Sequence, residues 1–305
     1  MQIVHRAMGF WKRRPRPRYA LALAGGGVIG GMYEVGAMTA LEERLNGSGS
    51  GFDVYVGCSA GSVVAALLAS GIRAGEIYHV LEEDLDDPLN MRRGVLFAND
   101  AFRLACTRFG RFMWAIGKQV LRGDRCLPDV LARAERVVFG AGELASVPIS
   151  EAVAASSAIP GFFDPYTIDG QDYVDGGTGF CGHADLAAEA GADVVFVINP
   201  LVPNRMADGG ASMRTRGVYT IMEQASRIYS QNLLQLGLAG LAVKFPRTAF
   251  YLLQPPRNTT LLFGPSMGFE ASRAALRFGY ESTKAWLGEQ GAPLIRSLAP
   301  EAAAI

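Results

Sequence analysis

A serine stands between two glycines at the point where an apolar run ends. Residues 52–56 are followed by Gly57-Cys58-Ser59-Ala60-Gly61, and a second apolar segment covers 62–70. A sharp turn from strand to helix needs small neighbours, and it lifts the serine hydroxyl clear at the start of the helix. The pattern favours a nucleophile elbow built on Ser59, with a tight turn and a capping serine as the alternative.

A run of three glycines ends another apolar segment. Residues 19–24 lead into Gly25-Gly26-Gly27, and a helical pattern follows. A glycine-rich turn at the start of a helix points bare backbone amides at whatever binds there, as an oxyanion hole requires. The amides of Gly26 and Gly27, with that of Ala60, could then hold the negative oxygen that develops when a serine attacks an ester.

The same glycines, with Gly30, match the Gly-x-Gly-x-x-Gly fingerprint of dinucleotide-binding proteins. That fold needs an acidic residue about 20 positions later, at the end of the second strand. Here Asp53 stands before residues 54–56, and the strand ends in Gly57 instead. The contact to the ribose is missing, which disfavours the dinucleotide alternative.

A serine nucleophile needs a base, and few residues qualify. His5 lies in a basic segment and His79 in a charged helical stretch, which leaves His183 or a carboxylate. Asp175 follows a hairpin-like turn and short strand over 168–174 and is followed by two glycines that permit close approach. An aspartate with an ordinary pKa of about 3.9 is a weak base, so this role requires burial. An ordinary Asp-Gly turn is the alternative for Asp175.

Strand and helix patterns alternate along the chain. The helix pattern over 30–45 has an apolar face with acids on the other side. This alternation predicts an α/β fold with a parallel sheet. The strands are expected at 19–24, 52–56, 136–139, 193–198 and 250–253, and the helices at 30–45, 62–70, 218–243 and 270–289.

Composition and charge limit the classes of function. The 305 residues carry 29 basic and 29 acidic side chains, so the whole protein has no general attraction to nucleic acid. Half of the residues are apolar and 19% are charged, which excludes a disordered chain or a coiled coil. No transmembrane helix is expected, because glycine and serine clusters break every apolar stretch. The four cysteines lack paired or metal-type spacing, so we expect a reduced, cytoplasmic protein without a metal or another cofactor.

The charge is distributed unevenly. Residues 1–20 contain six basic side chains and no acid, so this segment carries +6 and the remainder −6. We expect a basic N-terminal tail over 1–18, a catalytic domain over 19–290 with a helical cap at about 84–128, and a C-terminal tail over 291–305. The basic tail suggests peripheral contact with the inner face of a membrane.

Together these motifs resemble the patatin-like phospholipase family. The resemblance rests on the ordered set Gly25 to Gly30, Gly57 to Gly61 and Asp175-Gly176-Gly177, with Ala155 to Phe163 ahead of the last, and it spans most of 19–290. It implies a three-layer α/β/α sandwich around a mainly parallel sheet, and a Ser-Asp dyad of Ser59 and Asp175. It also implies that the loop of Gly25, Gly26, Gly27, Val28 and Gly30 is the oxyanion hole, with Gly57, Ala60, Gly61, Gly176 and Gly177 flanking the dyad.

The function that the resemblance implies is a lipid acyl hydrolase acting on lipids or phospholipids through an acyl-enzyme. Two alternatives stay open: a Ser-His-Asp esterase using His183, and a lipid-binding protein without catalysis. The chain departs from the family at Ile29, where relatives often carry arginine or lysine. This departure bears on the polarity of the substrate and leaves the dyad untouched.

Overall fold

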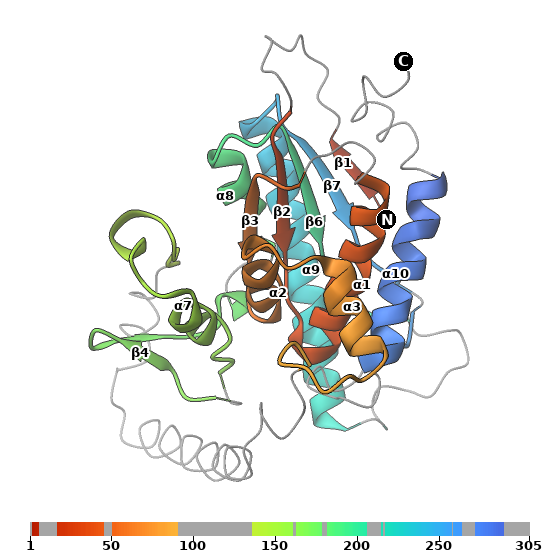
Figure 1. Cartoon of the computed structure of the whole chain (residues 1–305), viewed down its shortest axis with the longest axis horizontal. Coiled ribbons are helices and arrows are strands. Elements are labelled where there is room, and N and C mark those ends of the chain that lie inside the picture. The colour runs from red at the N-terminus through yellow and green to blue at the C-terminus, as the bar shows by residue number, and fades with distance from the viewer. Residues whose placement is uncertain are drawn as a thin grey trace. The chain divides into compact units, whose positions relative to one another are not determined.

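The chain forms two units in the computed structural model (Figure 1). The first unit comprises Met1–Asn90 and Phe180–Ile305, and the second comprises Met91–Gly179. The structure describes residues 2–5, 17–45, 51–90, 136–160, 163–178, 182–205, 215, 217–257, 259–263 and 272–289.

A five-stranded sheet lies at the centre of the first unit, in the order β1-β7-β6-β2-β3. Neighbours among β7, β6, β2 and β3 are parallel, and β1 is antiparallel to β7 at one edge. The strands are β1 Gln2–His5, β2 Tyr19–Leu23, β3 Val54–Gly57, β6 Val194–Ile198 and β7 Ala249–Leu253. The expected α/β fold with a mainly parallel sheet is confirmed.

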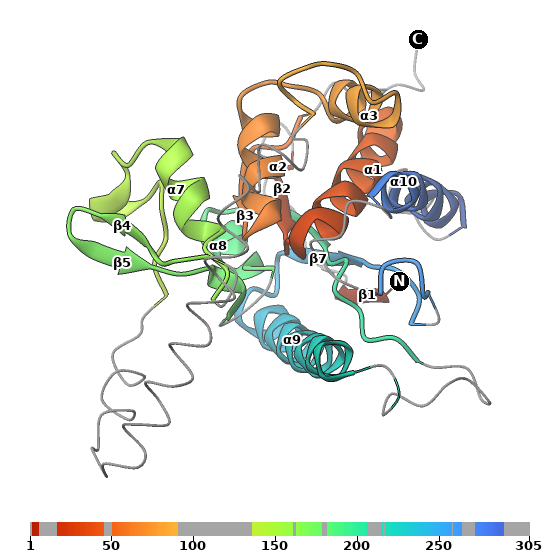
Figure 2. The same cartoon turned by 90° about the horizontal axis from the view of Figure 1, so that it is seen from below.

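Helices cover both faces of this sheet, which gives three layers (Figure 2). One face packs against α1, α2, α3 and α10, and the other packs against α8 and α9. The helices are α1 Gly27–Leu45, α2 Ala60–Ala69, α3 Ala74–Glu82, α8 Ala184–Glu189, α9 Val218–Lys244 and α10 Ser272–Glu289.

The central strand β2 shows how the sequence divides the two faces. All five of its residues are buried. Leu21 and Leu23 join the core on the α1 side, while Ala20 and Ala22 join the core on the α8 side, because side chains alternate along a strand. The small side chains of Ala20 and Ala22 face the alanines of the short helix α8, so this helix packs closely on the sheet.

Two glycines bring α1 and α10 into backbone contact. A Cβ atom at Gly36 would overlap the Leu276 carbonyl oxygen, and one at Gly279 would overlap the Tyr33 carbonyl oxygen. The two helices therefore touch where each lacks a side chain. This contact fixes the long axis of α1, whose first residue is Gly27 of the glycine loop.

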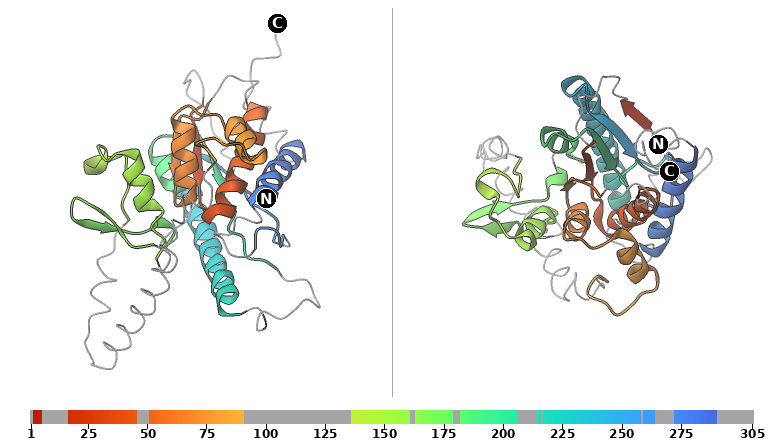
Figure 3. Two further views of the ribbon diagram at one scale, coloured as in Figure 1. Left: turned by 60° about the horizontal axis from the view of Figure 1, so that its bottom comes forward. Right: turned by 45° about the horizontal axis from the view of Figure 1, so that its top comes forward.

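The second unit is smaller. It contains a 3-10 helix η2 Gly142–Leu144, the helix α7 Ile149–Ser156, a hairpin of β4 Tyr166–Ile168 and β5 Gln171–Tyr173, and a 3-10 helix η3 Gly176–Thr178. Helix α7 lies beside the hairpin (Figure 3, green elements in the left view). The hairpin-like turn and short strand expected ahead of Asp175 correspond to β4 and β5.

One expected element differs from the structure. The strand expected over 136–139 is wrong: these residues lie outside regular strands, and Phe139 instead contacts the ring of Tyr173 at 5.3 Å between centroids. Strand β1 lies inside the segment expected to be a basic tail. Of the cap expected at 84–128, residues 84–90 follow α3 as turns, and the remainder lies outside the described residues, as does the tail over 291–305.

The helix contact between α1 and α10 is testable with two matched substitutions. Gly279→Ala adds a methyl group where the α1 backbone leaves no room, and we expect it to lower the free energy of unfolding by about 1–3 kcal/mol. Gly288→Ala lies on the same helix with no atom near its Cβ position, and we expect no loss and a gain of up to about 1 kcal/mol. Urea denaturation measures both, and equal stability of the two variants would contradict the packing described here.

Candidate active site

Ser59 occupies a strained turn between β3 and α2. Its backbone has φ 54° and ψ −131°, a combination that a side-chain-bearing residue rarely adopts. The turn is held by main-chain bonds: the Gly61 N–H donates to the Cys58 carbonyl at 2.9 Å, and the Ser62 N–H donates to the Ser59 carbonyl at 2.8 Å. The Ser62 hydroxyl donates to the same carbonyl at 2.6 Å. The geometry is that of an elbow that presents a serine at a helix N-terminus.

The glycines on either side of the elbow are required by space. A Cβ atom at Gly57 would lie 2.6 Å from the Ser62 α-carbon, and one at Gly61 would lie 2.7 Å from the Leu23 carbonyl oxygen. Both distances are shorter than real Cβ atoms show. The turn can therefore be this sharp only with glycine at both positions.

The glycine loop lies directly against the elbow within the first unit. Gly25, Gly26 and Gly27 have φ values of +79°, +118° and +65°, which favour glycine. A Cβ atom at Gly25 would overlap the Cys58 carbonyl oxygen and would lie 2.9 Å from the Ser59 Cβ. Because β2 and β3 are parallel neighbours, with Leu23 opposite Gly57, the two turns meet at one edge of the sheet.

The backbone amides of this loop differ in what they bind. The Gly25 N–H donates to the Glu34 Oε1 at 2.7 Å, and the Gly30 N–H donates to the Gly26 carbonyl at 3.1 Å. These two amides are engaged inside the protein and are not donors to a substrate in this conformation. The amides of Gly26, Gly27 and Val28 precede the first helical bond of α1, where helix amides lack intrahelical partners.

Glu34 is a residue of the site that the sequence reasoning missed. The pattern over 30–45 placed acids on the solvent side of the helix, yet the Glu34 side chain is fully buried, with 0% exposure. Burial raises the pKa of Glu34 well above its ordinary range, while the amides of Gly25 and Ala24 partly oppose this shift. Its place among apolar positions of the helix, between Tyr33 and Val35, is the signal that could have found it.

Ile29, at the departure from the family pattern, faces the protein interior. Its side chain is buried in the core on the α1 side of the sheet. An aliphatic residue suits that position, where a charged group would lose its hydration.

Asp175 lies in the second unit, directly after β5. Its N–H donates to the Ala158 carbonyl at 3.0 Å, and its Oδ1 accepts the Gly177 N–H at 2.7 Å. Ala158 and the Asp-Gly-Gly motif are thus joined within one unit. Gly176 and Gly177 form the first two residues of η3. Ser59 belongs to the first unit.

His183, the alternative base, stands at the start of α8 in the first unit. It has φ 20°, and its side chain is buried. Helix α8 packs on the opposite face of the sheet from α2, which follows Ser59.

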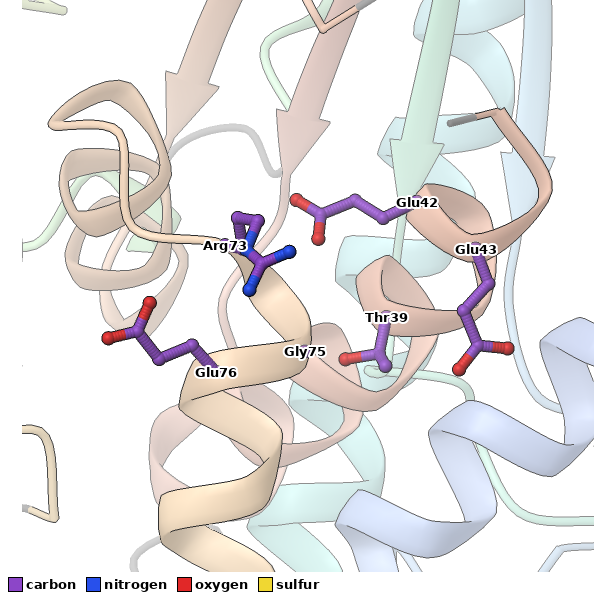
Figure 4. A pocket seen from close by; sticks show the side chains of 6 residues that line it. All are labelled: Thr39, Glu42, Glu43, Arg73, Gly75 and Glu76. Carbon is purple, nitrogen blue, oxygen red and sulfur yellow. The ribbon is translucent and has the colours of Figure 1, made fainter. Parts of the chain in front are cut away.

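An acidic depression between α1 and α3 lies apart from the elbow. Figure 4 shows its lining of Thr39, Glu42, Glu43, Arg73, Gly75 and Glu76. The Glu42 Oε2 accepts the Ala74 N–H at 2.9 Å, so this acid caps the N-terminus of α3. Since its α1 residues lie three or more turns beyond Gly27, the depression is separate from the glycine loop.

In the part of the chain that the structure describes, no three side chains of histidine, cysteine, aspartate or glutamate gather as a metal site would need. None of the described helices is both long enough and apolar enough to span a bilayer.

The three-layer fold places this chain among α/β proteins, and the turn at Ser59 is of the type found in serine hydrolases. The family model of patatin-like phospholipase matches residues 21–181, which is just over half of the chain. The chain therefore belongs to the patatin-like phospholipase family, as the sequence motifs predicted.

Curated relatives agree with this assignment. The chain is 32% identical over 170 residues to proteins described as uncharacterized NTE family proteins, one from Mycobacterium bovis and two from strains of Mycobacterium tuberculosis. The similar region covers 53% of this chain and 43% of each relative. The chain thus matches less than half of the length of these relatives.

The buried carboxyl of Glu34 predicts a pH dependence of stability. Because burial raises its pKa in the folded state, the folded state holds the proton more tightly than the unfolded chain does. The resulting stabilisation is fully present below the ordinary pKa of 4.5 and is lost as the pH rises through the folded-state value. Glu34→Gln cannot titrate, so the free energy of unfolding of the wild type should fall relative to that of Glu34→Gln as the pH rises from the ordinary value of 4.5 towards neutral. Urea denaturation across this range tests it, and a constant difference would count against a neutral Glu34.

Proposed function

We propose that this protein is a lipid acyl hydrolase that cleaves carboxylic esters of phospholipids or lysophospholipids. Membership of the patatin-like phospholipase family supports lipid hydrolysis in general. The observation that carries the proposal is the contact of the glycine loop with the elbow, where Gly25 lies against Ser59. A nucleophile and a set of backbone donors at one sheet edge are what acyl transfer requires.

The proposed reaction has two halves, with Ser59 as nucleophile and Asp175 as base. The Ser59 Oγ attacks the ester carbonyl carbon while Asp175 accepts the hydroxyl proton. The negative charge moves to the former carbonyl oxygen, which the amides of Gly26, Gly27 and Val28, with that of Ala60, stabilise. Collapse of the tetrahedral species breaks the ester bond, and the departing alcohol takes the proton from Asp175.

The second half releases the fatty acid. Water gives a proton to Asp175 and attacks the carbonyl of the acyl-serine, which forms a second tetrahedral species. Its collapse breaks the bond to the Ser59 Oγ, which recovers the proton from Asp175. The products are a free fatty acid and the original enzyme.

Two substitutions test the proposed dyad. With mixed phospholipids as substrate, we expect Ser59→Ala to lower the turnover at least about a thousandfold. We expect Asp175→Asn to lower it by about 10²–10⁴-fold, the usual contribution of a general base. Released fatty acids identified by mass spectrometry measure the turnover.

His183→Ala separates the two-residue mechanism from a triad. Turnover within about threefold of the wild type is expected, since Asp175 is the proposed base. Near-complete loss would favour the Ser-His-Asp esterase. A folded wild-type protein that neither releases fatty acid nor reacts with a fluorophosphonate at Ser59 would favour a lipid-binding protein without catalysis.

We also propose that the basic N-terminal segment contacts anionic membranes. Strand β1 ends at His5, opposite Phe250 at the start of β7, and Arg18 precedes β2. His5 and Arg18 therefore both lie at the edge of the sheet where the parallel strands begin. The Arg18 main-chain N–H donates to Asp193 and its guanidinium donates to the Ala190 carbonyl, which tie this residue to the fold.

Charge removal that spares Arg18 tests this membrane contact. Changing Lys12, Arg13, Arg14 and Arg16 to glutamine should weaken sedimentation with vesicles of anionic lipid at least about tenfold, since each such charge contributes about 1 kcal/mol near the surface. Binding of the wild type should also fall between about 0.05 M and about 0.5 M salt. Equal binding of both proteins to anionic and zwitterionic vesicles would contradict the proposal.

A further inference from the structure

Glu34 is tied to the glycine loop by one short hydrogen bond. It lies two helical turns beyond Gly27 on α1, and side chains on a helix lean toward its N-terminus. Its Oε1 accepts the Gly25 N–H at 2.7 Å. The second carboxyl oxygen, Oε2, is buried and has no hydrogen-bond partner among the described residues.

Burying a carboxyl group at this position costs free energy of hydration. The side chain is completely excluded from solvent, and an apolar residue of similar size would avoid the loss of hydration. The hydrogen bond that offsets this cost goes to the loop that faces Ser59. The acid therefore serves the conformation of that loop, and general packing does not explain it.

We infer that Glu34 is a positioning residue of the oxyanion hole, which holds the Gly25 amide so that the amides of Gly26, Gly27 and Val28 face the substrate oxygen. This inference rests on the proposed function. It adds to the reaction a residue that does not touch the substrate.

The loop geometry shows how one bond can control three amides. The residue before Gly25 is also held, because the Ala24 N–H donates to the Ile198 carbonyl of β6 at 3.0 Å. The Gly25 carbonyl is pressed against the first turn of α1, where a Cβ at Gly30 would lie 2.5 Å from it. Ala24 and the Gly25 carbonyl are thus fixed. The hydrogen bond of the Gly25 N–H then limits the backbone rotation of Gly25 to Gly27, all three of which have positive φ values.

The charge state of the acid suits this task. An ionised carboxylate beside the loop would repel the negative oxygen that forms during ester cleavage. Burial raises the pKa of Glu34 and so favours the neutral form, which accepts a hydrogen bond without adding negative charge. A glutamine amide would supply the same acceptor, whereas methionine would supply none at similar volume.

The test compares Glu34→Gln and Glu34→Met in the full-length chain. Glu34→Gln should keep kcat within about threefold of the wild type, while Glu34→Met should lower kcat by about 10–100-fold, less than outright removal of a donor costs. KM should change by less than about threefold in both, because the loop acts on the transition state. The rate of fluorophosphonate labelling of Ser59 should follow kcat, since the phosphonyl oxygen occupies the same donors.

Thr39→Val is the matched control for loss of a buried polar group. Thr39 lies on the same helix, is buried, and donates its hydroxyl to the Val35 carbonyl at 2.9 Å. This variant should lose stability without a loss of kcat. Amide hydrogen exchange at Gly25 gives a readout that does not depend on activity: exchange should be at least about tenfold faster in Glu34→Met than in Glu34→Gln or Thr39→Val.

The outcomes separate the inference from the proposed function. An active wild type together with a Glu34→Met variant of unchanged kcat and labelling rate overturns the positioning role and leaves the hydrolase proposal standing. Loss of kcat in Glu34→Gln equal to that in Glu34→Met also overturns it, because acceptance of the hydrogen bond would then not be what matters. A folded wild type that neither hydrolyses lipid nor labels at Ser59 overturns both.

Discussion

The close approach of two backbone turns is the constraint on which the site depends. The glycine loop and the elbow meet where Gly25 lies against Cys58 and Ser59, with no room for a side chain between them. Two neighbouring parallel strands place both turns at the same sheet edge. The strained backbone of Ser59 costs on the order of 1–3 kcal/mol, and the surrounding fold must supply it.

That support comes from the buried centre of the first unit. Every residue of β2 is buried, and the strand has hydrogen-bonded neighbours on both sides. Helix α1, which begins in the glycine loop, is in turn held along its length by the backbone contact of Gly36 and Gly279 with the facing helix. The loop is therefore positioned by two rigid elements, and small changes in either would move its amides relative to Ser59.

Local pattern was enough to predict the elements that carry the site. Strand, glycine turn and helix follow one another twice within about fifty residues, so the sequence predicted both the elbow and the parallel pairing of its strand. Sequence separation explains what was missed. Strand β1 pairs with β7 across almost the whole chain, and the carboxyl of Glu34 is buried by partners that a helix pattern does not reveal. The apolar run over 136–139 resembled a strand, but these residues pair with no described strand, and the Phe139 ring packs against the Tyr173 ring instead.

Two helix N-termini set the electrostatic potential around the glycine loop. Helices α1 and α2 both begin at this edge, at Gly27 and Ala60, and the first turn of neither contains an acid. The partial positive charge of each helix N-terminus is therefore not neutralised by a side chain of its own helix. Glu34, which accepts a hydrogen bond from this loop, has its pKa raised by burial, which favours its neutral form and so reduces its opposition to this field. A loop of bare amides between two such helix ends favours a negatively charged oxygen over a neutral one, and this difference is what a catalyst of ester cleavage must provide.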